Sequence, residues 1–135
     1  MVPITITYDG DLSCSATHGP SASTITTDAP RDNQGLGRTF SPTDLVATAL
    51  GSCVLTTMAI VARRNGIEIR GAHVHVEKHM SDNPRRIARL PVVVTMPARL
   101  DDDNRKRLEN AAELCPVKAS LAPGVDTPVT FVWPA

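Results

Sequence analysis

The sequence predicts a mixed α+β fold with the element order β-β-β-α-β-β-α-β. Three observations predict it: strand-like alternation ahead of residue 28, an almost uncharged helical run at 45–62, and a second group of strands and a helix beyond residue 67. The 135 residues show no internal repeat and no low-complexity segment. We therefore expect a single domain over residues 1–135.

The first part of the chain predicts a three-stranded meander. Residues 4–8 alternate between apolar and polar side chains and reach an Asp-Gly turn. Two further strands are predicted over 12–17 and 21–27, separated by a Gly-Pro pair. A loop over 28–38, which contains proline and two glycines, then leads to the first helix.

The uncharged run lies in a helix predicted over residues 42–65. Ser41 is its expected N-cap, Pro42 its first helical residue, and Asp44 completes a capping signature. Gly66 follows two arginines and an asparagine and is the expected left-handed stop. The run just reaches the length of a membrane span. Its threonines, alanines, serine and glycine make it only modestly hydrophobic, so we expect a buried central helix.

The remaining elements follow from hydrophobic spacing and turn residues. An amphipathic helix with a charged outer face is expected after two strands, and a short helical turn and a closing strand follow it. The predicted ranges are strands over 67–80 and 87–96 with a turn at 81–84, a helix over 101–114, a helical turn over 116–121, and a strand over 129–133.

Charge and cysteine content restrict the possible functions. The 14 basic residues balance the 14 acidic ones, which argues against a nucleic-acid or anionic-membrane partner. No signal-peptide pattern opens the chain, so we expect a cytoplasmic location. The three cysteines are an odd number without the spacing of a disulfide scaffold.

Two of these cysteines are placed very differently. Cys53 lies near the centre of the predicted central helix, and Cys115 ends the second helix just before Pro116. A thiol in the middle of a helix is usually a small hydrophobic side chain. The alternative is that the two thiols meet, so that one attacks a substrate and the other resolves the product. Cys14, in an early strand, is expected to be inert.

Four segments resemble the OsmC/Ohr superfamily, the osmotically induced protein C and organic hydroperoxide resistance proteins. They are FSPTDLV at 40–46, ALGSC ending at Cys53, VEK at 76–78 and CPVK at 115–118. The resemblance implies an intertwined homodimer in which sheets from both chains wrap around the central helices. It also implies that the two cysteines share a pocket at the dimer interface.

The resemblance further implies a thiol-dependent peroxidase. Cys53 matches the cysteine that attacks an organic hydroperoxide and becomes a sulfenic acid, and Cys115 matches the cysteine that closes a disulfide with it. An external dithiol, of lipoyl type in the hydroperoxide resistance branch, would reduce that disulfide. Neither a metal nor an organic cofactor is required. Leu50, Val54 and Met58 are expected to form an apolar pocket beside Cys53.

The sequence departs from the hydroperoxide resistance branch at the groups that activate its cysteine. That branch uses an arginine from the N-terminal hairpin and a glutamate, whose position is Thr43 here. The first arginine of this chain is Arg31, beyond the early strands. We expect Arg38 or Arg31 to substitute, with Asp44 holding one of them. Without a cation, burial should raise the pKa of Cys53 and make it a poor nucleophile.

The sequence is therefore also compatible with a second function. The same apolar pocket would suit a small-molecule or redox-sensing protein with weak or no peroxidase activity.

Four polar residues alternate along one predicted strand: His73, His75, Glu77 and His79. A His-x-His pair on a strand can chelate a metal. Strand positions four residues apart are ~13 Å distant, so at most two of the four could share an ion. We interpret this set as a solvated sheet face and predict no metal site.

Overall fold

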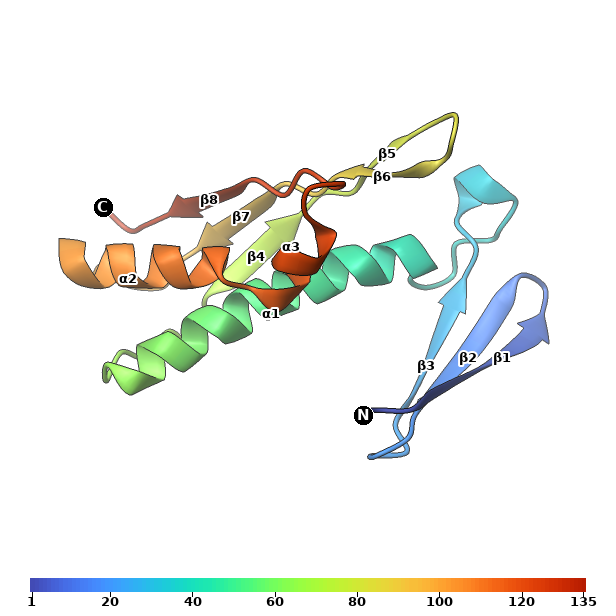
Figure 1. The fold of residues 1–135 in the computed structure, drawn as a ribbon, viewed down its shortest axis with the longest axis horizontal. Helices are drawn as coiled ribbons and strands as arrows, with labels where there is room; N and C mark the ends of the chain where they lie inside the picture. Colours follow the sequence, from blue (N-terminus) through green and yellow to red (C-terminus); the bar gives the residue numbers. More distant parts are fainter. The chain divides into compact units, whose positions relative to one another are not determined.

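The computed structural model describes all 135 residues and confirms the mixed α+β class. Figure 1 shows the elements in chain order. The chain forms two compact units, residues 1–45 and residues 46–135, which are described separately below.

The first unit contains the predicted meander. Strands β1 (Ile4–Gly10), β2 (Ser13–His18) and β3 (Thr24–Asp28) pair antiparallel in the order β1-β2-β3 (Figure 1). A 3₁₀ turn, η1 (Arg31–Asn33), follows in the loop. The predicted turns and strands are thus confirmed to within about three residues at each end.

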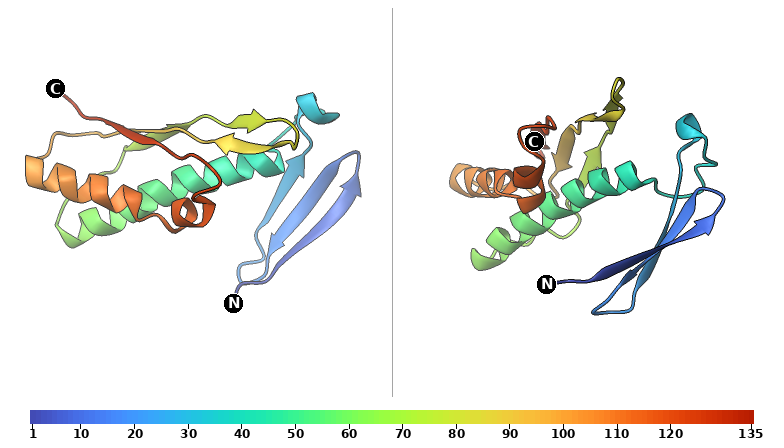
Figure 2. Two further views of the ribbon diagram at one scale, coloured as in Figure 1. Left: turned by 45° about the horizontal axis from the view of Figure 1, so that its top comes forward. Right: turned by 45° about the vertical axis from the view of Figure 1, so that its right-hand side comes forward.

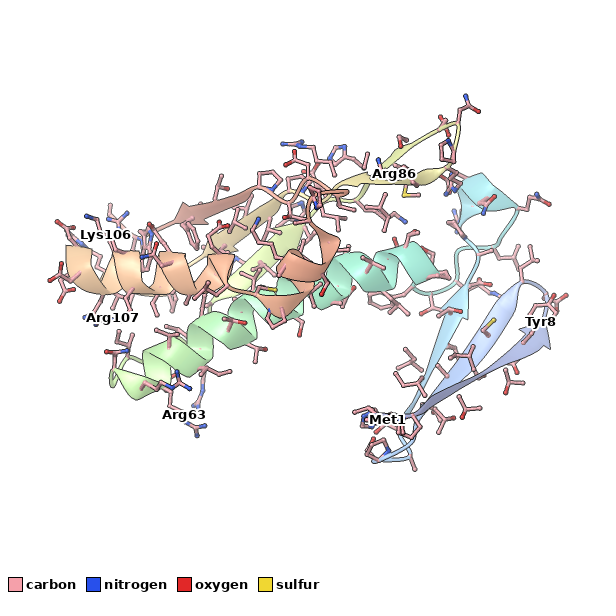
Figure 3. All side chains as sticks on the ribbon, viewed as in Figure 1. Met1, Tyr8, Arg63, Arg86, Lys106 and Arg107 are labelled. Atoms are coloured by element: carbon pink, nitrogen blue, oxygen red, sulfur yellow. The ribbon has the colours of Figure 1, made fainter.

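One face of this sheet carries large apolar side chains that remain exposed. Ile4, Ile6 and Tyr8 alternate along β1, and the register places Ile6 opposite Ala16 and Ala16 opposite Ile25. The side chains of these three β1 residues and of Ile25 are all more than half exposed, and Figure 3 labels Tyr8. The opposite face is polar and carries threonines and serines together with Asp9 and Asp28. We refer to the set Ile4, Ile6, Tyr8 and Ile25 as the apolar sheet face.

The loop after β3 is held by a buried carboxylate. Asp28 is 1% exposed, and its Oδ2 accepts from the backbone N–H and the Nε of Arg38 at 2.8 and 2.9 Å. Nη2 of Arg38 donates to the other carboxylate oxygen at 3.1 Å. The side-chain hydrogen bonds from Arg38 are the main reason that the pKa of Asp28 falls from its ordinary 3.8 to about 2.

Helix α1 (Pro42–Arg64) begins and ends as the sequence predicts. The backbone N–H of Asp44 donates to Ser41 Oγ at 3.1 Å, and Ser41 N–H donates to Asp44 Oδ2 at 2.9 Å, which is a reciprocal capping box. Gly66 has φ of 66° and stops the helix. By length and composition alone α1 could cross a membrane, a test that core helices also pass. Its buried residues belong to the core described below.

The second unit contains a three-stranded sheet and a separate hairpin. Strands β4 (His73–Val76), β7 (Val92–Thr95) and β8 (Val129–Val132) form the sheet in the order β4-β7-β8. The β4/β7 pair is antiparallel and the β7/β8 pair is parallel. The hairpin consists of β5 (His79–Ser81) and β6 (Arg86–Arg89).

The two long strands predicted over 67–80 and 87–96 are therefore wrong in extent. Residues 67–72 are not a strand, and Gly71 there has φ of 94°, a left-handed conformation that ends extended pairing. The second strand breaks ahead of Val92 because Pro91 has no N–H to donate to a neighbouring strand.

Helices α2 (Asp102–Glu113) and α3 (Pro116–Leu121) occupy the predicted positions. Asp101 caps α2 by accepting the N–H of Asn104 at 2.8 Å. Figure 2 shows α1 and α2 on the same side of the β4-β7-β8 sheet. The outer face of α2 is charged, and Figure 3 labels Lys106 and Arg107 on it.

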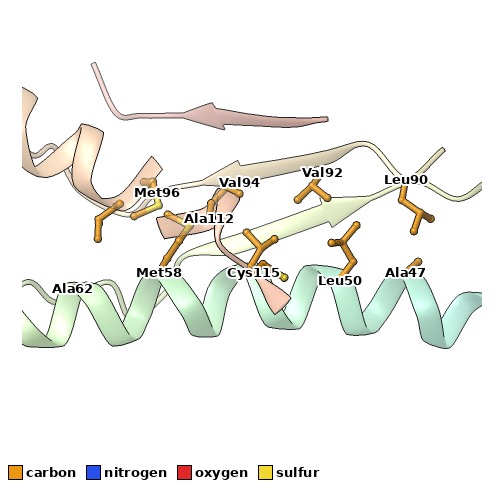
Figure 4. Close-up of a cluster of buried hydrophobic side chains, with 12 residues drawn as sticks. Ala47, Leu50, Met58, Ala62, Leu90, Val92, Val94, Met96, Ala112 and Cys115 are labelled. Carbon is orange, nitrogen blue, oxygen red and sulfur yellow. The ribbon is translucent and has the colours of Figure 1, made fainter. Parts of the chain in front are cut away.

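The core of the second unit lies between α1, α2 and the sheet (Figure 4). Leu50, Val54 and Met58 of α1 are fully buried, as are Val94 of β7 and Leu108 of α2. Close approach of α1 to the sheet depends on a small residue. A Cβ added at Gly51 would lie 2.9 Å from Val74 Cγ2 and 3.0 Å from Val76 Cγ2, which is closer than side chains tolerate.

Gly51→Leu should destabilise the protein, because the added side chain enters a tightly packed contact between α1 and β4. We expect the free energy of unfolding to fall by about 1–3 kcal/mol. Urea unfolding at a fixed protein concentration measures the change. Ser52→Leu is the matched control, since Ser52 is the next residue on α1 and is exposed. Equal effects of the two substitutions would contradict the packing argument.

The Asp28–Arg38 pair should make stability depend on pH. The folded-state pKa of Asp28 lies below its ordinary value, so the pair contributes fully above about pH 4 and is lost as the pH falls through about 2. Asp28→Asn should therefore lower the urea midpoint at pH 6, and its difference from the unmodified protein should shrink between pH 4 and pH 2. A difference that stays constant over this range would exclude the carboxylate as the cause.

Candidate functional site

The second unit brings Cys53 and Cys115 into hydrogen-bonding contact. Cys53 lies in the middle of α1 and is partly exposed, whereas Cys115 is fully buried between α2 and α3. Figure 4 shows Cys115 lying against α1 within the core. Both cysteines are free thiols. The sequence alternative in which the two thiols meet is the one that the structure adopts.

The chain around Cys115 turns sharply because of the residue that follows it. Cys115 is the N-cap of α3, and Pro116 takes the first helical position, where its missing N–H costs nothing. The backbone N–H of Lys118 donates to Cys115 Sγ at 3.4 Å. The same turn directs the backbone N–H of Val117 to Cys53.

A third donor lies on α1 itself. Thr57 follows Cys53 by one helical turn, and its Oγ1 is 3.9 Å from Cys53 Sγ. The Cys53 sulfur is thus surrounded by the Cys115 thiol, the Val117 N–H and the Thr57 hydroxyl.

The two thiols have opposite pKa shifts. Burial raises the pKa of Cys53, but hydrogen bonds from Cys115, Val117 and Thr57 outweigh it, so the pKa lies below the ordinary value. Burial and the neighbouring Cys53 both raise the pKa of Cys115. The expectation that Cys53, without a cation, would have a raised pKa is therefore wrong. Hydrogen bonds from neutral groups to the charged form lower the pKa of Cys53.

Lys118 anchors the turn that carries these donors. The Lys118 side chain is 18% exposed, and its ammonium group donates to the backbone carbonyl of Thr127 and, at 2.8 Å, to the Thr127 hydroxyl. A carboxylate oxygen of Glu113 lies 3.5 Å from the same nitrogen. One side chain thus connects the end of α2, the start of α3 and the segment ahead of β8.

The three predicted supporting residues have partners within the first unit. Arg38 binds Asp28, as described above, and Nε of Arg31 donates to the carbonyl of Leu36 at 3.2 Å. Asp44 caps α1. Asp28, the carboxylate partner of Arg38, was not identified from the sequence. A role for Arg38, Arg31 or Asp44 toward Cys53 stays a prediction.

Leu50, Val54 and Met58 do not line an open pocket. They follow one another at intervals of four residues, so they share the helix face that is fully buried against the sheet. The residues of α1 that are exposed beside Cys53 are instead Ala49 and Thr56, four residues before it and three after. Helical spacing counted from Cys53 would have identified them.

The sequence reasoning also missed Thr57, Val117 and Lys118. Thr57 has a sequence signal, because residues four apart on a helix are neighbours. Lys118 stands in the CPVK segment, but only tertiary structure shows its contact with Thr127.

The polar strand residues form a surface cluster. Glu77 accepts from, or pairs with, Nε2 of His79 at 3.1 Å and Nε2 of His75 at 3.7 Å, and all three side chains are exposed. No group of three or more metal-ligating side chains is placed to hold an ion. Cys14 is half-buried in β2 and pairs in register with Tyr8 and Thr27.

Comparisons with known proteins agree with this arrangement. The family model for OsmC-like proteins matches residues 34–130. A crystal structure from Psychrobacter arcticus 273-4, provisionally assigned to osmotic stress induction and the detoxification response, is 44% identical and superposes with a TM-score of 0.92. The match covers 98% of this chain and 96% of that one. No curated protein matches the chain.

More distant structures share the fold. An organic hydroperoxide resistance protein OsmC from Legionella pneumophila is 14% identical, with a TM-score of 0.78 over 97% of this chain and 96% of that one. The organic hydroperoxide resistance protein OhrB of Bacillus subtilis is 23% identical, with a TM-score of 0.70 over 98% of each chain. The family match over most of the sequence and the 44% identical relative show that this chain belongs to the OsmC-like protein family.

Proposed function

We propose that this protein is a thiol-dependent peroxidase that reduces organic hydroperoxides through Cys53 and Cys115. The observation that carries the proposal is the thiol pair itself. Cys53 is partly exposed and has a lowered pKa, while its neighbour Cys115 is buried and has a raised pKa. An attacking thiol needs access and ionisation, and a resolving thiol must stay protonated until it is used.

The first step is attack by the Cys53 thiolate on the distal oxygen of the hydroperoxide. The O–O bond breaks as the S–O bond forms, and the alkoxide leaves and takes a proton to become the alcohol. Sulfur is oxidised by two electrons and becomes a sulfenic acid. The Val117 N–H and the Thr57 hydroxyl are hydrogen-bond partners of the Cys53 sulfur, and hydrogen bonds to a thiolate lower its pKa.

The second step uses Cys115, which already contacts the oxidised sulfur. Its sulfur attacks the sulfenic sulfur, the S–S bond forms as the S–O bond breaks, and the leaving hydroxide takes the proton that Cys115 gives up and becomes water. An external dithiol then reduces the Cys53–Cys115 disulfide by two exchange steps and is itself oxidised to a disulfide. We propose a lipoyl-type dithiol for this role, and a cytoplasmic location, where thiols remain reduced.

The relatives support this assignment. The relative from Psychrobacter arcticus is only provisionally assigned to the detoxification response, and the more distant structures from Legionella pneumophila and Bacillus subtilis are named organic hydroperoxide resistance proteins. The substrate class also suits the surroundings of the thiols. Leu114, directly before Cys115, is 74% exposed and offers apolar contact to an organic substrate.

One observation favours a second function, the binding of a small apolar ligand. Two adjoining hollows of about 350 and 410 Å³ lie between the second half of α1 and residues 67–72. They share five lining residues, of which two are charged: Thr56, Ala59, Glu68, Ile69 and Arg70. A ligand bound there would lie one helical turn beyond the thiol site, so binding and peroxide reduction are separable by experiment.

We also propose that the protein is a homodimer, as its resemblance to the family implies. The apolar sheet face supports this, because a contiguous exposed apolar patch on a protein surface marks an interaction site. A second copy of the chain would cover this face.

Cys53→Ser should abolish hydroperoxide turnover, because no other group supplies the attacking sulfur. Cys115→Ser should allow one oxidation and accumulate a sulfenic acid that a dimedone probe labels. Stopped-flow oxidation of the reduced protein by cumene hydroperoxide and by hydrogen peroxide measures both effects. We expect the organic peroxide to react faster.

Cys14→Ser is the control and should leave both rates unchanged. A reduced protein that loses thiols to every peroxide no faster than free cysteine would refute the peroxidase. Binding of an apolar fluorescent ligand by the same sample would then favour the second function.

Ile6→Glu should convert the dimer to a monomer, because it places a charge in the middle of the apolar sheet face. Thr7→Glu is the matched control, since Thr7 is the next residue of β1 and points to the polar face. Sedimentation velocity at micromolar concentration should give a dimer for the unmodified protein and for Thr7→Glu. A monomeric unmodified protein would contradict the assembly.

A further inference from the structure

We propose that Thr57 is a catalytic residue, whose hydroxyl donates a hydrogen bond to the Cys53 sulfur and holds it as the nucleophilic thiolate. In this proposal the backbone N–H of Val117 is the second donor to the Cys53 sulfur. Lys118 is a positioning residue, because its contact with Thr127 holds the turn that carries this N–H. The inference deepens the proposed peroxidase, on which its catalytic meaning rests. It assigns activation of the thiol to neutral donors of the same unit.

The position of Thr57 favours this role. A threonine inside a helix usually bonds back to a carbonyl one turn earlier, and the residue one turn before Thr57 is Cys53. Its Oγ1 lies 3.9 Å from the sulfur, within the range of a hydrogen bond to sulfur. When Cys53 is a thiolate it has no proton, so the threonine hydroxyl must be the donor.

Val117 contributes a backbone donor from α3. A backbone N–H cannot be redirected by a rotamer change, so its aim depends on the turn from Cys115 to Lys118. That turn is fixed at its far end by the Lys118 ammonium group, which binds the Thr127 hydroxyl at 2.8 Å. Thr127 is itself 6% exposed, so the anchor lies inside the protein.

The groups that stabilise the Cys53 thiolate in this unit are neutral. The helices α2 and α3 bring the ionisable side chains Cys115, Glu113 and Lys118, and the last two bind each other. Strand β4 turns Val74 and Val76 toward α1, and its histidines are exposed. The groups that lower the pKa of Cys53 are Cys115, the Val117 N–H and Thr57, none of which is a cation.

Alkylation of the reduced protein tests the proposal without any peroxide. The rate at which iodoacetamide modifies the peptide that bears Cys53 is followed by mass spectrometry from pH 5 to pH 10, since only the thiolate reacts. Thr57→Val removes the hydroxyl and keeps the shape of the side chain. We expect the rate at pH 7 to fall about three- to tenfold, the effect of losing one hydrogen bond of ordinary net strength.

Rescue and positioning variants separate a chemical role from a structural one. Thr57→Ser keeps the hydroxyl and should retain most of the rate at pH 7. Lys118→Met should shift the pH profile of Cys53 alkylation to higher pH, as Thr57→Val does. The reason is that the turn carrying the Val117 N–H is no longer held in place by the contact between Lys118 and Thr127. Thr56→Val is the matched control on the same helix and should have the profile of the unmodified protein.

A variant of Arg38 tests the alternative that an arginine activates Cys53. Arg38→Met should leave the alkylation profile unchanged. A profile that moves with Arg38→Met and not with Thr57→Val would overturn the proposal and assign activation to arginine. The peroxidase is tested independently. Peroxide turnover by the Cys53→Ser variant would refute that function, whereas the alkylation profiles of proteins that retain Cys53 would still test the hydrogen bond from Thr57.

Discussion

The packing of α1 against the sheet is the constraint on which the site depends. Gly51 allows the helix to approach Val74 and Val76 closely, and Leu50, Val54 and Met58 fill the space beside it. Cys53 lies at the edge of this buried face, where one side of the helix meets the core and the other meets solvent. A thiol in that place is near enough to the core to contact Cys115 and near enough to the surface to meet a substrate.

The difference between the two thiols has a simple physical origin. Both are penalised by burial, but Cys53 receives more hydrogen-bond donors and lies nearer to solvent. A thiol that ionises first makes ionisation of its neighbour harder, because two negative charges in contact repel each other. In the proposed peroxidase, the same contact would favour Cys53 as the nucleophile and keep the proton on Cys115 until the second step.

The first unit is held together differently from the second. Its loop is ordered by a buried carboxylate whose oxygens are satisfied by Arg38, since an unpaired charge at 1% exposure would be costly. Its sheet, in contrast, exposes apolar side chains on one face. The buried carboxylate of the first unit finds its hydrogen-bond donors within the same chain, whereas the apolar side chains of its sheet are not buried by that chain. For this reason we propose that a second copy of the chain covers the apolar sheet face.

The sequence by itself determined the class of fold, the caps of α1, the amphipathic face of α2 and the family, because these features depend on local spacing and short motifs. It left two alternatives for Cys53 and Cys115, an inert buried thiol and a pair in contact, and did not decide between them. Tertiary structure alone decided the breaks at Gly71 and Pro91, the burial of the supposed pocket residues and the donors around Cys53. Such contacts join residues far apart in the chain, such as Lys118 with Thr127 or Val117 with Cys53, and their geometry exists only once the helices have packed on the sheet.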